Sequence, residues 1–220
     1  MCGGKGTRLE SDREKPLHPV GGVPMVDSVL RALEGSRIET IYAAVSPNAP
    51  ETRIHLERAD SVTTVETPGE GYVADLVTVL ESEDGASPSR PVLTVAADLP
   101  LLEAPVVDRV LDLHEHGRGG PGNQNRAASR TICVPATLKR RLGASVDSRL
   151  ESEAHLAPTG VNVVGDADDT MTNVSYDPRL AVNVNRLEDA RLAAELRATI
   201  RGGDENEDGD ADAEVTDECA

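Results

Sequence analysis

The first residues of the chain combine glycines with basic side chains in a way that suits phosphate binding. The segment MCGGKGTRL, residues 1–9, holds three glycines, one lysine and one arginine, and Lys15 and Pro16 follow. Backbone N–H groups of a glycine-rich turn can converge on one anion, because no Cβ atoms block its approach. Two of the three lysines in this acidic chain, Lys5 and Lys15, lie in the first fifteen residues. We predict a polyphosphate site here; the alternative is a surface turn with scattered basic residues.

The spacing of this glycine-rich segment excludes two common phosphate-binding motifs. It lacks the G-x-x-x-x-G-K-[ST] pattern of a Walker loop, and it lacks the G-x-G-x-x-G fingerprint of dinucleotide-binding folds. The predicted site therefore belongs to another class of nucleotide-binding protein.

Asp98 is the residue best placed to hold a metal ion. It follows the most apolar run of the chain, PVLTVAA at residues 91–97. Open α/β sheets bind their ligands at the carboxyl ends of the strands, which is where this carboxylate falls. Carboxylate oxygens are preferred ligands of Mg²⁺. A turn-forming aspartate before Leu99 and Pro100 is the alternative.

Short apolar runs and amphipathic segments alternate along the chain and must position these residues. We expect strands at residues 38–45, 62–66, 91–100, 129–135, 156–165 and 179–185. We expect helices at residues 23–35, 72–83, 104–116 and 186–200. Alternation of this kind predicts an α/β fold of three layers, with a mostly parallel sheet covered by helices on both faces.

Composition narrows the class of protein further. The 220 residues carry a formal net charge of −17 and contain no Phe or Trp, which argues against a nucleic-acid binder. Such acidity is typical of proteins from salt-rich cytoplasm, where screening weakens carboxylate repulsion. There is no long apolar run and no signal-peptide pattern, so we expect a cytoplasmic protein without a membrane span. We expect one domain at residues 1–202 and an acidic disordered tail at residues 203–220.

The combination GGKGTRL with the downstream KP resembles the signature of nucleotidyltransferases built on a Rossmann-like sheet. Further segments resemble one archaeal branch of that group, the GTP:adenosylcobinamide-phosphate guanylyltransferases. These segments are SPNAPET (46–52), TPGEGYVADL (67–76), AADLPLL (96–102), APTGVNVV (157–164) and AVNVNRLEDA (181–190). The resemblance covers about residues 2–200 and leaves the acidic tail out.

The resemblance implies a role for each residue that matches the pattern. Arg8, Lys15 and Asp98 are expected to carry catalysis, and Asp98 and Asn185 to hold Mg²⁺. The expected nucleotide contacts are Gly3, Gly4, Lys5, Gly6, Thr7, Arg8, Lys15, Ser46, Asn48, Gly69, Gly71 and Asp98. The expected acceptor contacts are Gly160, Asn162 and Asn183. Asn183 and Asn185 are alternatively helix-capping residues, and Gly160 alternatively marks a β-bulge.

The implied reaction transfers GMP from GTP to adenosylcobinamide phosphate, a phosphorylated corrinoid, and releases pyrophosphate. Two alternatives remain open: a molybdopterin or sugar-phosphate nucleotidylyltransferase, and a nucleotide-binding regulatory module without catalysis. A homodimer is also left open. Members of the group begin with a buried strand before the glycine loop, so we expect about eight to ten apolar residues upstream of Met1 in the full-length protein.

Overall fold

The computed structural model describes residues 1–2, 8–9, 11–81, 88–116, 128–167 and 169–207, with side chains described up to Ile200. The expected phosphate contacts Gly3, Gly4, Lys5, Gly6 and Thr7 lie outside these residues, so their roles stay predictions.

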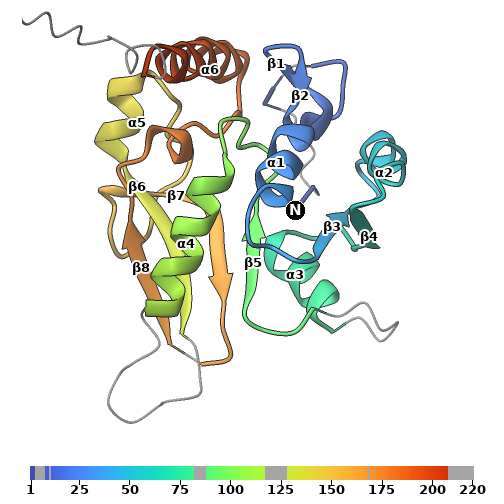
Figure 1. The fold of residues 1–220 in the computed structure, drawn as a ribbon. Coiled ribbons are helices and arrows are strands. Elements are labelled where there is room, and N and C mark those ends of the chain that lie inside the picture. Colours follow the sequence, from blue (N-terminus) through green and yellow to red (C-terminus); the bar gives the residue numbers. More distant parts are fainter. Residues whose placement is uncertain (3–7, 10, 82–87, 117–127, 168, 208–220) are drawn as a thin grey trace, which may run out of the picture.

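The strands of the described residues form three hydrogen-bonded sheets (Figure 1). They are β1 (Pro19–Val20) with β2 (Val23–Pro24), β3 (Ile41–Val45) with β4 (Val62–Glu66), and, in spatial order, β5 (Val92–Val95), β7 (Leu156–Val164), β6 (Ser129–Pro135) and β8 (Thr170–Val174). β3 and β4 are parallel. In the four-stranded sheet β5, β6 and β8 point the same way, and β7 runs in the opposite direction between β5 and β6. Strand directions are therefore mostly parallel, as expected.

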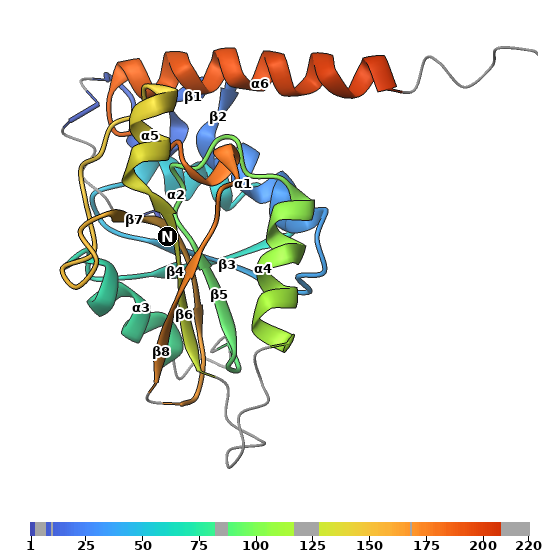
Figure 2. The ribbon, with the colours of Figure 1, turned by 90° about the vertical axis from the view of Figure 1, so that its left-hand side faces the viewer.

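Helices cover both faces of these strands and one end of them. They are α1 (Met25–Glu34), α2 (Pro50–Leu56), α3 (Tyr72–Leu80), α4 (Ala104–His116), α5 (Ala136–Leu142) and α6 (Leu187–Glu207), with 3₁₀ turns η1 (Lys15–Leu17) and η2 (Pro178–Leu180). Figure 2 shows α3 and α4 on opposite sides of the strands and α6 lying across their upper end. The expected α/β/α layering is confirmed.

The main core lies between α1, α4 and the four-stranded sheet. The amphipathic stripe of α1 buries Val29 and Ala32 against the valines of α4, which in turn pack on the inner face of the sheet. The members from the sheet and α4 include Val106, Val107, Val110, Ile132, Val134, Val161 and Val163. Burial of these branched side chains holds the strand ends at fixed positions, and the candidate site lies at those ends.

Met1 and Cys2 lie between the edges of β3 and β5. The Met1 amino group donates to Val95 O at 2.9 Å and Ala97 N donates to Met1 O at 3.3 Å, which is the pattern of a parallel bridge. On the other side, Cys2 N donates to Ala44 O at 2.9 Å. A largely apolar cavity of about 610 Å³ continues between the two strands. Met1 and Cys2 therefore link β3 to β5 beside this cavity.

The structure removes one expected strand and lengthens one expected helix. Residues 179–185 form η2 and an irregular segment instead of a strand. Val182 and Val184 are buried in an apolar cluster with Leu9 and Met25, and Val184 N donates to Asp98 O at 3.0 Å, so packing and a loop contact hold the segment in place of a ladder. Helix α6 continues to Glu207, past the expected helix end at residue 200, since extending a formed helix needs no new nucleation. The division into a domain and an acidic tail stays a prediction. Residues 208–220 lie outside the described part of the chain.

None of the helices in the described residues combines the length and apolar character needed to cross a bilayer.

Candidate active site

Asp98 is held by contacts from three separate segments. Its loop follows β5, where Ala96 N donates to Gly160 O at 2.9 Å and Ala97 N donates to Met1 O. Val184 N donates to the backbone oxygen of Asp98 itself, and the neighbouring Leu99 is fully buried. The carboxylate is therefore fixed at the end of β5, as the sequence predicts.

Lys15 reaches the same point from the amino-terminal segment, and Glu14 anchors that segment. The Glu14 carboxylate accepts hydrogen bonds from Glu51 N at 2.8 Å and from Thr52 N and Oγ1 at 2.7 and 2.6 Å, at the start of α2. An acidic group at a helix amino terminus is stabilised by unpaired N–H groups and the helix dipole. The buried Pro16 fixes the following turn. These contacts leave the Lys15 side chain free to extend toward Asp98.

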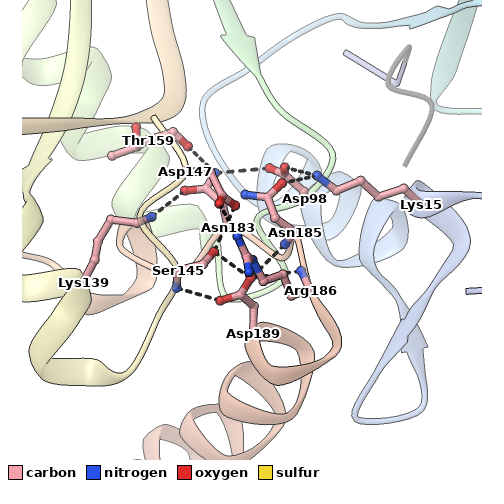
Figure 3. A network of polar contacts seen from close by, with 10 residues as sticks. All are labelled: Lys15, Asp98, Lys139, Ser145, Asp147, Thr159, Asn183, Asn185, Arg186 and Asp189. Carbon is pink, nitrogen blue, oxygen red and sulfur yellow. Dashed lines mark hydrogen bonds and ion pairs between the residues drawn. The ribbon is translucent and has the colours of Figure 1, made fainter. Parts of the chain in front are cut away.

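The Lys15 ammonium lies between two oxygen atoms that the sequence assigns to a metal site. Nζ donates to Asp98 Oδ2 at 2.6 Å and to Asn185 Oδ1 at 2.7 Å. The side chains of Lys15 and Asp98 are each less than one fifth exposed, which strengthens their attraction relative to a surface pair. Figure 3 shows Lys15 and Lys139 approaching this cluster from opposite sides.

Asn183 bridges Asp98 to a second lysine. Its Nδ2 donates to Thr159 O at 2.8 Å and to Asp98 Oδ1 at 3.2 Å, and its Oδ1 accepts from Lys139 Nζ at 3.1 Å. With donors on one side and an acceptor on the other, the amide has one orientation that satisfies all three contacts. Asn183 therefore positions both Asp98 and Lys139; its expected contact with the acceptor stays a prediction.

Asp189 fixes the segment that carries Asn183 and Asn185. It lies in the first turn of α6, is 1% exposed, and accepts hydrogen bonds from Asn185 N at 3.1 Å and Arg186 N at 3.0 Å. Ser145 N and Oγ donate to it at 2.8 Å each. This arrangement resembles a capping box, in which an acidic side chain in the first turn binds the N–H group before the helix. Asp189 thus ties the α5–β7 connection to the two asparagines.

A cavity of about 420 Å³ opens beside this cluster. Its lining includes, in order, Arg8, Tyr72, Asp98, Lys139, Ser145, Asp147, Gly160, Asn162, Asn183 and Asn185. Partial burial raises the pKa of Asp147, but hydrogen bonds from Arg186 and Ser145 and the charges of Arg186 and Arg8 outweigh it, so the net pKa is lowered. Burial lowers the pKa of Lys139, opposed by the charges of Asp189, Asp98 and Asp147. The cavity is therefore lined by charges of both signs.

Gly160 and Asn162 form the β7 side of this cavity. Gly160 has a φ of +83°, and a Cβ atom there would lie 2.8 Å from the Ala96 Cβ. A glycine is thus required to let the Asp98 loop approach β7, which is a packing reason for this residue. Asn162 Nδ2 donates to Tyr72 Oη at 3.2 Å, and Tyr72 Oη lies 2.6 Å from Thr94 Oγ1. The acceptor roles of both residues stay predictions.

The residues expected around the base and ribose gather at the ends of β3 and β4. A Cβ atom on Gly69, whose φ is +72°, would lie 2.9 Å from Ser46 Cβ and 3.0 Å from Asn48 Nδ2. Gly69 N donates to the buried Asp75 at 2.8 Å, which fixes the turn before α3. Gly71 has a φ of +122° and no neighbour that a Cβ would meet. Ser46, Asn48 and Gly69 are therefore in contact, as their common position at strand ends predicts, and Gly71 lies apart from them.

The oxygen ligands at Asp98 suit a hard divalent cation. Asp98 Oδ2 and Asn185 Oδ1 already converge on one positive atom, Lys15 Nζ, and both are oxygen donors of the kind that Mg²⁺ selects. In the described residues no group of three or more His, Cys, Asp or Glu surrounds one point. A magnesium ion here would take one carboxylate and one amide from the protein, with phosphate oxygens completing its coordination.

Sequence reasoning missed four of the residues that build this site. Lys139, Ser145, Asp147 and Asp189 lie outside the recognised segments or were not singled out in them. Asp189 had a detectable signal, since an acidic residue in the first turn of a predicted helix is a capping position. Lys139 had a weaker one: it is the third lysine in a chain that otherwise uses arginine.

The fold and this site together define a nucleotidyltransferase. The MobA-like NTP transferase domain model matches residues 1–154, and the chain belongs to that family.

The comparisons with individual proteins agree with this family. The chain is similar to adenosylcobinamide-phosphate guanylyltransferase of Methanocaldococcus jannaschii, at 28% identity over 89% of this chain and 94% of the relative. It is also 32% identical to the bifunctional protein GlmU of Enterococcus faecalis, over 52% of this chain and 24% of that protein.

Solved structures support the fold. A CMP:2-keto-3-deoxy-manno-octonic acid synthetase in complex with CTP superposes with a TM-score of 0.57 at 14% identity, covering 87% of this chain and 95% of that one. A Bacillus anthracis structure described as a glucose-1-phosphate thymidylyltransferase also gives 0.57, at 15% identity, covering 89% and 92%.

Proposed function

We propose that this nucleotidyltransferase transfers GMP from GTP to adenosylcobinamide phosphate. The observation that carries the proposal is the convergence of Lys15 on Asp98 and Asn185, two residues that line a cavity of about 420 Å³. The similarity to the Methanocaldococcus jannaschii guanylyltransferase over nearly the whole of both chains supports the choice of nucleotide and acceptor.

In the proposed reaction an oxygen of the acceptor phosphate attacks the α-phosphorus of GTP. The bond between the α-phosphorus and the oxygen that bridges to the β-phosphorus breaks, so pyrophosphate leaves and adenosylcobinamide-GDP forms. This chemistry requires little covalent participation by the protein; it needs positioning and countercharge.

The residues of the candidate site have separate tasks in this scheme. Asp98 and Asn185 would hold Mg²⁺, which would supply charge neutralisation at the phosphates. Lys15 would bind the triphosphate tail, and Arg8 adds a second positive charge at the cavity. Ser46, Asn48 and Gly69 lie at the strand ends where the base and ribose are expected, and the glycine loop at residues 3–7 is expected to cradle the phosphates.

The test is a pyrophosphate-release assay on the purified chain with GTP, MgCl₂ and adenosylcobinamide phosphate. We propose that the acidic surface is adapted to salt, so the assay buffer contains molar KCl. The expected result is release of pyrophosphate and formation of adenosylcobinamide-GDP by mass spectrometry, loss of turnover with EDTA, and slower turnover with ATP, CTP or UTP.

Parallel reactions separate the competing functions. N-acetylglucosamine 1-phosphate, glucose 1-phosphate and molybdopterin are offered as acceptors under the same conditions. The proposal fails if one of these acceptors reacts while the corrinoid does not, or if GTP binds and no acceptor reacts.

A further inference from the structure

The lysines of this chain are concentrated at the candidate active site. Only three of its 22 basic residues are lysines, and the two that the structure describes are Lys15 and Lys139. Both ammonium groups reach the Asp98–Asn183 pair, one from η1 and the other from α5 (Figure 3). Both described lysines thus place a compact point charge at the Asp98 cluster, and Arg8 is the arginine that lines the cavity beside it.

Lys139 is a costly residue to bury without a function. It is 4% exposed, and its burial lowers its pKa because the charged form loses solvation. An ammonium carries three donors. In the part of the chain that the structure describes, one hydrogen bond is recorded for Nζ, the 3.1 Å contact with Asn183 Oδ1.

The simplest structural explanation is that Lys139 neutralises the neighbouring carboxylates, but each of these has closer partners. Asp98 is bound by Lys15 at 2.6 Å. Asp147 is bound by Arg186 at 2.9 Å. Asp189 accepts four hydrogen bonds from Asn185, Arg186 and Ser145. Lys139 attracts all three carboxylates at longer range, but its hydrogen bond in the described residues goes to Asn183.

Lys15 and Lys139 approach the Asp98 cluster from opposite sides (Figure 3). Attacking and leaving oxygens lie roughly in line on opposite sides of the transferred group. Lys15 lies on one side of the expected metal ligand Asp98, where we place the triphosphate tail. Lys139 lies on the other side, beyond Asn183, and lines the cavity together with Ser145.

We propose that Lys139 binds the phosphate of the acceptor. This inference rests on the proposed transfer to a phosphorylated acceptor. In the cavity the carboxylates of Asp98 and Asp147 repel an incoming phosphate, and Lys139, with Arg8 nearby, supplies the opposing charge. The Asn183 bridge then couples the acceptor phosphate to the residue expected to hold the metal.

The experiment compares two ligands that differ only in the phosphate. Affinities for adenosylcobinamide phosphate and for adenosylcobinamide are measured by calorimetry, in the presence of Mg²⁺ and a GTP analogue with a non-transferable α,β-methylene bridge. The dissociation constant of adenosylcobinamide divided by that of adenosylcobinamide phosphate is the factor by which the phosphate strengthens binding. In Lys139→Met this ratio should fall by about tenfold to a hundredfold, the range for a hydrogen bond to a charged group, while affinity for the GTP analogue stays within twofold.

Two further variants control for charge and folding. Arg140→Met removes the same charge from an exposed position on the same helix and should leave the ratio unchanged. Lys139→Arg keeps the charge, so its affinity ratio should lie between those of Lys139→Met and the wild type. An unchanged ratio in Lys139→Met overturns the proposal, as does an equal loss of affinity for both corrinoids and the nucleotide together with a lower melting temperature.

Failure of the proposed function gives a different pattern. In that case the wild-type chain does not turn over the corrinoid at all. If it uses another phosphorylated acceptor, Lys139 is judged by the same ratio, measured with that acceptor and its dephosphorylated form.

Discussion

Two clusters of charged residues in this molecule are built in contrasting ways. At η2, the Asp177 carboxylate accepts from Arg179 N, Nε and Nη2 at 3.0, 2.9 and 2.7 Å, and from Arg109 at 3.1 Å. Arg179 also donates to Glu103 at 2.5 Å. At Asp98, by contrast, Lys15 and Lys139 each make one or two contacts beside an open cavity.

The contrast separates a structural cluster from a functional one. A guanidinium that binds one carboxylate through two nitrogen atoms has a fixed geometry and few free donors. A lysine ammonium with one or two partners can exchange them for a ligand without breaking the fold. The Asp177 cluster therefore should support stability alone, and the Asp98 cluster should support binding and turnover.

Replacing Asp98 should have the largest effect on activity. Asp98→Asn keeps the shape and the contact with Asn183 but removes the charge that holds the cation, so we expect kcat/KM to fall by about a thousandfold or more, the loss of a main electrostatic contribution. GTP binding without Mg²⁺ should be retained, because the lost charge repels the triphosphate. Pyrophosphate release and calorimetry measure the two quantities. Activity within tenfold of wild type would place the metal elsewhere.

Replacing Lys15 should have the next largest effect, and a selective one. Lys15→Met should weaken GTP binding by about tenfold to a hundredfold, because one charged hydrogen-bonding partner of the triphosphate is lost. Affinity for GMP should change little, since GMP lacks the β- and γ-phosphates.

Arg13→Met, which removes a charge from an exposed position in the same segment, is the matched control. Equal losses for GTP and GMP in Lys15→Met would mean that Lys15 supports the fold of the site and not the triphosphate.

The sequence predicted the positions of regular elements better than the connections between them. Strands β4 and β6 and helix α4 match their predicted ranges. In β6 and α4 the apolar pattern marks a buried face, and in β4 the β-branched residues mark the strand. The segment at residues 179–185 has the same alternation of apolar residues, yet its backbone bonds to the Asp98 loop. The alternation of apolar residues shows which side chains are buried. It does not show whether the backbone pairs with a neighbouring strand or makes a single contact with a loop.

The same limit applies to the site. Lys15, Asp98 and Asn185 could be predicted because family motifs mark them, and the structure brings them together. Lys139 and Asp189 lie 41 or more positions away from Asp98 in the sequence, and only the packing of α5 and α6 against the strand ends brings them near it. The capping position of Asp189 could be predicted from the local sequence, but the nearness of either side chain to Asp98 could not, because it depends on this packing.

The smallest effect on activity, and a clear one on stability, is expected for Asp177. Asp177→Asn removes a carboxylate whose pKa burial raises, but hydrogen bonds from Arg179 and Arg109 and the charge of Arg179 outweigh burial, so the net pKa is lowered. We expect a loss of about 2 kcal/mol in the free energy of unfolding, typical for hydrogen bonds to a charged group, and a melting temperature lower by about 4–8 °C.

The stability that Asp177 contributes should depend on pH. Because its pKa is lowered in the folded state, the contribution is present above the pKa of the unfolded chain, near 4, and is lost as the pH falls through the pKa of the folded protein. The gap between wild type and variant in thermal melts should therefore be full at pH 7 and shrink below about pH 4. Turnover with unchanged kcat/KM would confirm that this cluster is structural, and a fall in turnover without a change in melting temperature would remove the distinction between the two clusters.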